Sequence, residues 1–71
     1  MENLEEIAIK NSELIEQLIG LDTNKANEIM GKYAKSIIAA EEKGDSELIP
    51  IYAKMNAEVQ EQISKYTQKT Q

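Results

Sequence analysis

Two pairs of glutamates come closest, by residue type and spacing, to a catalytic or metal-binding motif. They are Glu13 with Glu16 and Glu58 with Glu61. A separation of three residues puts both carboxylates of a pair on one side of a helix, and helical di-iron and Mg²⁺ enzymes turn such pairs inward to hold metal. Here each pair is predicted to point to the polar side of its helix, and the His that di-iron sites require is absent. We therefore expect no metal site and no cofactor.

Nucleophilic catalysis lacks the side chains that it needs. The Ser and Thr hydroxyls have no His to act as a base, and the chain has no Cys to supply a thiolate. No Lys falls on a predicted apolar helix face, where loss of water would lower its pKa. Gly20, Gly31 and Gly44 are too far apart to form a phosphate-binding loop. The sequence thus predicts no catalytic residues and a protein that is not an enzyme.

The size and charge of the chain exclude further classes of protein. The 71 residues, with a net charge of −5, predict a single domain over 1–71. The absence of Cys and His excludes disulfides and zinc fingers, so a core this small depends on close helix packing or on a partner chain. All 8 basic residues are Lys, which lacks the bidentate fork with which Arg recognises phosphates and guanine edges. We expect no nucleic-acid partner.

The chain is also predicted to be cytoplasmic, with no membrane partner. Met1 is followed by glutamates at 2, 5 and 6, the opposite of the positive start of a signal peptide. The longest apolar run, 37–40, is far shorter than the roughly 20 residues that span a bilayer. The composition, rich in Lys, Ile, Asn and Glu and without Arg, is typical of AT-rich genomes, such as those of low-GC bacteria, phages and other mobile elements.

Apolar residues recur every three or four positions in three segments, which is the pattern of amphipathic helices. The predicted helices span about 2–19, 23–43 and 46–66. The second is apolar over roughly half its circumference, so it is expected to contact two neighbours. No stretch alternates apolar and polar residues over the length of a strand. Residues 67–71 carry no apolar side chain and are predicted to fray.

Glycines and capping residues separate these segments. Gly20 is predicted to adopt the left-handed conformation that ends a helix, with Asp22 or Thr23 as the cap of the next one. Gly44 is predicted to end the second helix in the same way. Pro50 is expected in the first turn of the third helix, where its missing N–H costs least.

These elements predict an all-α fold, a small antiparallel bundle of three helices joined by short links. The alternative is a long hairpin of the second and third helices, with the first helix packing on another chain in a homodimer. Under that alternative, Asn11, Leu14 and Leu18 belong to an interface between chains instead of a core.

Asn11 lies near the centre of the predicted apolar face of the first helix, where a buried amide costs about 1–3 kcal/mol unless it is hydrogen-bonded. It could pair with a second Asn11 across a symmetric seam, or bond within the chain to a tyrosine hydroxyl (33, 52 or 66) or a carbonyl. Gly31, at the edge of the second apolar face, would let another helix approach closely, either the third helix or a second subunit. The predicted oligomer interface is Asn11, Leu14, Leu18, Gly31 and Ile38.

The polar face of the first helix concentrates negative charge around one apolar residue. Glu5, Glu13 and Glu16 lie opposite the apolar face, and Ile9 sits among them. A single exposed Ile is common on protein surfaces and usually has no role. The alternative is an apolar anchor within an electrostatic rim that steers a basic partner. These residues form the predicted partner-binding site.

Together these features favour a small acidic, non-catalytic adaptor or inhibitor that binds the basic surface of a protein partner and forms a homodimer. A structural subunit that assembles with copies of itself is the alternative. A helix-turn-helix transcriptional regulator is less favoured, because no cluster of Arg, Asn or Gln stands at the start of the third helix, where base edges are usually contacted.

Overall fold

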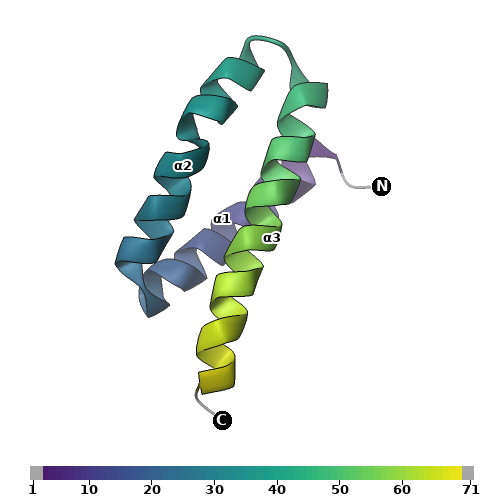
Figure 1. Cartoon of the computed structure of the whole chain (residues 1–71). Helices are drawn as coiled ribbons and strands as arrows, with labels where there is room; N and C mark the ends of the chain where they lie inside the picture. The colour runs from purple at the N-terminus through teal and green to yellow at the C-terminus, as the bar shows by residue number, and fades with distance from the viewer. Residues whose placement is uncertain (1–2, 70–71) are drawn as a thin grey trace.

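The computed structural model describes residues 3–69, with side chains described for 3–67. Three helices follow one another along the chain: α1 (Leu4–Leu21), α2 (Thr23–Glu41) and α3 (Asp45–Lys69). Helices α2 and α3 form a hairpin, while α1 meets α2 at its end and crosses behind α3 (Figure 1). Each helix contacts both of the others. The predicted all-α bundle of three helices is confirmed, with α1 packed on its own chain.

Helix α1 begins with a side-chain cap. The Asn3 carboxamide oxygen accepts a hydrogen bond from the backbone N–H of Glu6 at 2.9 Å. This bond satisfies one of the N–H groups that have no acceptor within the first turn of a helix. Glu5 and Glu6 lie in the same turn, where the positive end of the helix dipole favours carboxylates.

The link between α1 and α2 is the single residue Asp22. Its backbone is extended, its N–H donates to the carbonyl of Leu18 at 2.7 Å, and its carboxylate accepts from the N–H of Lys25 at 3.0 Å. Asp22 is therefore the cap of α2, one of the two residues predicted for this role. The prediction for Gly20 was wrong, because Gly20 lies inside α1, which continues to Leu21. A left-handed glycine is unnecessary where one extended residue ends one helix and caps the next.

The second link confirms the predicted role of Gly44. This residue has a φ of 115°, a left-handed conformation that glycine adopts without a Cβ penalty. Its N–H donates to the carbonyl of Ala40 at 3.0 Å and so closes the end of α2. Since α3 starts at Asp45, directly after this glycine, Pro50 lies in the second turn and not in the first. Pro50 has no N–H to donate to the carbonyl of Ser46.

Helix α3 continues beyond its predicted end at 66. It reaches Lys69, and the Thr67 hydroxyl donates to the carbonyl of Ile63 at 3.2 Å. Of the segment 67–71 that was predicted to fray, 67–69 are helical, and 70–71 lie outside the described residues. Backbone hydrogen bonds can extend a helix past its last apolar residue, and the tie between Tyr66 and Asp22 holds this end against the bundle.

The core lies along the line where the three helices meet. Leu18 and Val59 are fully buried at its centre. No helix within residues 3–69 has both the length and the apolar character needed to cross a membrane. The principal buried cluster contains Ile15, Leu18, Ala26, Ile29, Tyr33, Met55, Val59 and Ile63.

Candidate partner-binding surface

The four residues of the predicted partner-binding site lie together on the outer side of α1. Glu5, Ile9, Glu13 and Glu16 are all exposed, and Ile9 keeps 52% of its surface in contact with solvent. They share one face because α1 is continuous from Leu4 to Leu21, so residues three and four apart are neighbours. We call these four residues the acidic face.

A shallow groove between α1 and α3 borders the acidic face. Its volume is about 350 Å³, and half-buried Leu14 contributes apolar surface to its wall. On the α3 side, the Gln60 amide donates to the carboxamide oxygen of Asn56. The groove is lined by Lys10, Glu13, Leu14, Gln17, Asn56 and Gln60. Glu13 thus belongs both to the acidic face and to the lining of this groove.

The Asn11 amide has one hydrogen-bond partner within its own chain. The side chain is 5% exposed, and its Nδ2 donates to the backbone carbonyl of Tyr52 at 3.0 Å. The partner is therefore a carbonyl of the same chain, and none of the tyrosine hydroxyls. The Asn11 Oδ1 is buried and accepts no hydrogen bond from the described part of the chain. A buried acceptor without a donor weakens the fold.

The other residues of the predicted oligomer interface divide into two groups. Leu18 is 0% exposed and Leu14 is half-buried against the core, so both are core residues of a single chain. Gly31 and Ile38 lie on the outer surface of α2, where Ile38 is 63% exposed. A Cβ at Gly31 would meet no described atom within 4 Å, so its small size does not serve packing against α3. The homodimer stays a prediction that depends on these two residues.

A second groove, which the sequence analysis did not identify, opens between α1 and α2. The two helices diverge from Asp22 (Figure 1), and the space between them, about 240 Å³, is floored by α3. The sequence feature that could have indicated this groove is the wide apolar arc of 23–43. The arc is wider than the surface of the second helix that α1 and α3 cover. We call the space the α1/α2 groove, and it is lined by Ala8, Asn11, Ser12, Ile15, Met30, Ile37, Tyr52 and Met55.

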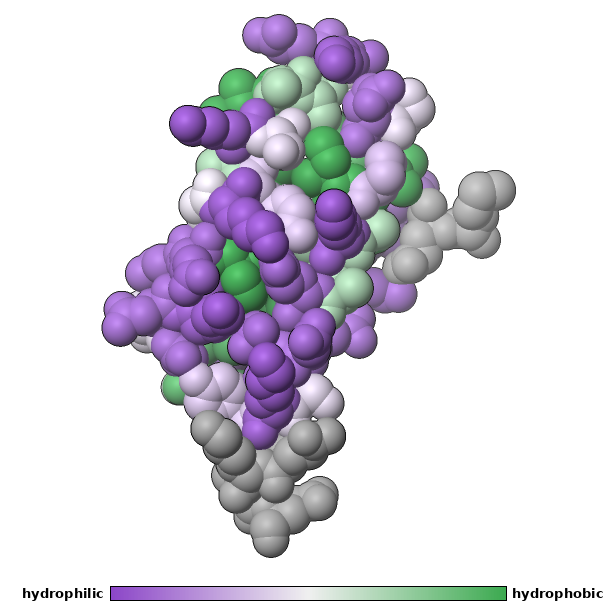
Figure 2. Space-filling view, in the orientation of Figure 1, coloured by the Kyte–Doolittle hydropathy of each residue, from purple (hydrophilic) through white to green (hydrophobic). Residues whose placement is uncertain are grey.

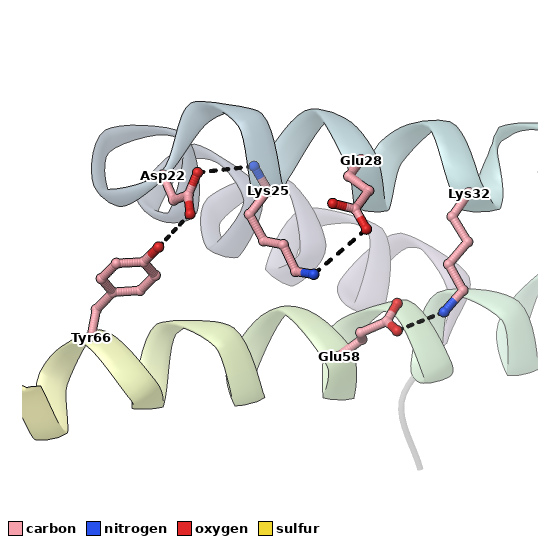
Figure 3. A network of polar contacts seen from close by, with 6 residues as sticks. All are labelled: Asp22, Lys25, Glu28, Lys32, Glu58 and Tyr66. Atoms are coloured by element: carbon pink, nitrogen blue, oxygen red, sulfur yellow. Dashed lines mark hydrogen bonds and ion pairs between the residues drawn. The ribbon is translucent and has the colours of Figure 1, made fainter.

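The opposite side of the molecule is mainly polar. Figure 2 shows hydrophilic side chains over most of the face on which α3 lies in front, with apolar atoms in small separate areas. Polar contacts join α2 to α3 there (Figure 3). Lys32 binds Glu58 at 2.7 Å, and the Tyr66 hydroxyl donates to the Asp22 carboxylate. On α2 itself, Lys25 lies 3.6 Å from Glu28.

These contacts shift the pKa values of the groups involved. The hydrogen bond from Lys32 holds the pKa of Glu58 below its ordinary value, and the same bond raises the pKa of Lys32. The bond from Tyr66 lowers the pKa of Asp22, and the pKa of Tyr66 rises in return. Burial is the main cause of the raised pKa of Tyr33. The charged forms of both carboxylates are thus the forms that fit the fold.

Glu58 was predicted to point to the polar side of its helix, and this prediction was wrong. It is half-buried between α2 and α3, and its Oε2 atom is buried without a hydrogen-bond partner among the described residues. The contact with Lys32 was missed because these residues are far apart in the chain. In the described part of the chain, no three potential metal ligands come together.

Comparison with known proteins adds no further constraint. No protein family model, curated protein or solved structure matches this chain. The acidic face and the two grooves are therefore the features from which a function has to be inferred.

Proposed function

We propose that this protein is a small acidic, non-catalytic adaptor or inhibitor that binds a protein partner with a basic surface through the acidic face of α1. The observation that carries the proposal is Ile9, which is 52% exposed among the carboxylates of Glu5, Glu13 and Glu16. An apolar side chain within a charged rim combines affinity from burial with selection by charge.

The charge distribution supports this assignment. The chain carries 13 acidic against 8 basic residues. On α2, Lys25 and Lys32 bind Glu28 and Glu58, so these positive groups are engaged away from the acidic face. A field of one sign steers a partner of the opposite sign during approach, and salt weakens it. The adaptor or inhibitor would act by occupying the partner's surface, which requires no reacting group.

Substitution of Ile9 tests the proposal. The partner is first identified by affinity capture from the native host and mass spectrometry. Ile9→Arg, or the combined charge reversal of Glu5, Glu13 and Glu16 to Lys, is expected to abolish capture of that partner, because each removes the anchor or the attractive charge. Circular dichroism should show unchanged helicity, since all four side chains are exposed.

Leu21→Arg is the matched control, because Leu21 is another exposed apolar residue of α1, 46% exposed, and lies outside the acidic face. This variant should capture the partner as the parent protein does. Capture that is unchanged by Ile9→Arg and by the charge reversal would overturn the proposed function.

A further inference from the structure

The α1/α2 groove has an apolar surface that extends beyond its own walls. Ala8 and Ile15 line it from α1, and Met30 and Ile37 from α2. On α2 the apolar surface continues outward to Ala34, one turn from Met30, and to Ile38, which is 63% exposed. Together the groove and this edge form an elongated apolar track along α2, the shape that fits the apolar stripe of a helix.

A buried polar atom lies at the same place. Asn11 lines the groove, and its Oδ1 accepts no hydrogen bond from the residues that the structure describes. The side chain is 5% exposed, so its amide has little access to water. Because the Oδ1 is closed to solvent, a group that enters the groove does not reach it, so the occupant is selected by the apolar surface and by the charge at the borders.

The borders of the groove and its outer edge carry three exposed carboxylates and one exposed lysine, Lys35, which lies one turn before Ile38. Glu5 and Glu16 lie within one turn of the lining residues Ala8 and Ser12 on α1, and Glu41 lies one turn beyond Ile37 on α2. All three carboxylates are on exposed residues. Lys10, by contrast, lines the groove between α1 and α3, and Lys32 binds Glu58 on the far side of α2.

The charge of these borders separates two classes of occupant. A second copy of the chain, with a net charge of −5, would bring identical acidic borders together. A helix with Lys or Arg beside its apolar stripe would instead place opposite charges at both edges.

We propose that the α1/α2 groove binds an amphipathic helix whose apolar stripe is flanked by basic residues. This inference rests on the proposed function, because it names the element through which the basic partner docks. Met30 on the α2 wall and Met55 on the α3 floor have flexible side chains that can adapt to the apolar side chains of such a helix.

The two groove methionines provide the probe. The protein is labelled with ¹³C at the Met methyl groups and titrated with a synthetic helical peptide of Leu, Ala and Lys, in which Leu forms one stripe and Lys flanks it. We expect the Met30 and Met55 methyl signals to shift together and to saturate. A peptide of the same composition in scrambled order should leave them unchanged, and so should one with Glu in place of Lys.

Two variants then locate the contact without touching the acidic face. Ile38→Ser should weaken peptide binding about tenfold by removing apolar contact. Glu41→Lys should weaken it about threefold by reversing a border charge. Their matched controls, Leu21→Ser and Glu61→Lys, change exposed residues away from the groove and should bind as the parent does.

The outcomes separate this inference from the proposed function. If Ile9→Arg abolishes partner capture while Ile38→Ser and Glu41→Lys leave partner and peptide binding unchanged, the groove proposal fails and the acidic face stands. If the scrambled peptide shifts the Met30 and Met55 methyl signals as much as the striped peptide does, the binding is non-specific charge attraction and the inference is overturned. Methyl shifts that appear on raising the protein concentration, without peptide, would assign the groove to a second copy instead.

Discussion

At the scale of single residues, Asn11 places a polar amide among the apolar side chains of α1. Its Nδ2 donates to the Tyr52 carbonyl on α3, while its Oδ1 has no donor within the described residues. The first contact ties α1 to α3 and offsets part of the cost of burying the amide. The buried Oδ1, by contrast, has lost its contact with water and gained no hydrogen-bond donor in return. Asn11 thus favours one arrangement of these helices at some cost in stability.

The variant Asn11→Leu tests this account. We expect its free energy of unfolding in urea to rise by about 1 kcal/mol, because an unpaired buried acceptor costs about 1–3 kcal/mol and one hydrogen bond contributes only about 1 kcal/mol. The adjoining groove has room for the larger side chain. Asn11→Ala should be less stable than Asn11→Leu, since it leaves a cavity. A loss of stability in Asn11→Leu would contradict this expectation and show that the bond to the Tyr52 carbonyl contributes more than the unpaired Oδ1 costs.

At the scale of the elements, the helix ends are set by local backbone chemistry. Asp22 ends α1 with its extended backbone and caps α2 with its carboxylate. Gly44 ends α2 through its left-handed φ, which lets α3 begin at the next residue. The acidic face depends on the first of these, because α1 has to remain helical through Glu16 to keep the four residues on one side.

The two glycines should therefore respond in opposite ways to alanine. Gly20→Ala is expected to raise the free energy of unfolding by about 1 kcal/mol, because alanine is the better helix former. A Cβ there meets no described atom within 4 Å. Gly44→Ala should lower it by about 1 kcal/mol or more, because alanine is strained at a φ of 115°. Urea denaturation of both variants measures the difference, and a reversed order would show that α1 ends at Gly20.

At the scale of the whole molecule, α3 holds the other two helices in place. It packs against both α1 and α2, and polar contacts fasten its sides: Glu58 to Lys32, and Tyr66 to Asp22. Because α3 also floors the α1/α2 groove, these contacts help to set how far α1 and α2 stand apart. The polar contacts of α3 therefore affect the width of the candidate docking surface.

This network predicts how stability depends on pH. The pKa values of Asp22 and Glu58 are lowered from 3.8 and 4.5, so their contribution is complete above those values and is lost as the pH falls through the folded-state pKa. The pKa values of Tyr66 and Lys32 are raised from 10.0 and 10.5. The contribution of these two groups to stability is therefore lost as the pH rises through the raised values. Stability should therefore be greatest between these limits.

The variant Tyr66→Phe isolates one part of this dependence. It removes the hydroxyl that lowers the pKa of Asp22, so thermal unfolding between about pH 2 and about pH 7 should show a shallower acid slope than in the parent. Tyr52→Phe is the control, because it removes a tyrosine hydroxyl from the same helix and leaves Tyr66 on Asp22. An acid slope that Tyr66→Phe leaves unchanged would mean that the bond to Asp22 does not form in solution.

The sequence by itself determined the features that depend on near neighbours. The periodicity of apolar residues predicted the three helices, Asp22 and Gly44 predicted where two links lie, and helical spacing placed Ile9 among its glutamates. Each follows from residues a few positions apart, whose relative geometry a helix determines. Gly20 and Pro50 were placed wrongly, because the end of a helix depends on which of several possible caps the packed chain adopts.

The tertiary structure alone decided the features that join distant parts of the chain. Asn11 meets the carbonyl of Tyr52, Glu58 meets Lys32, and Leu18 lies in the core of one chain instead of an interface. The α1/α2 groove exists because α1 diverges from α2 while α3 closes the floor. Periodicity shows which face of a helix is apolar, but the angle at which helices cross depends on how all their side chains pack together.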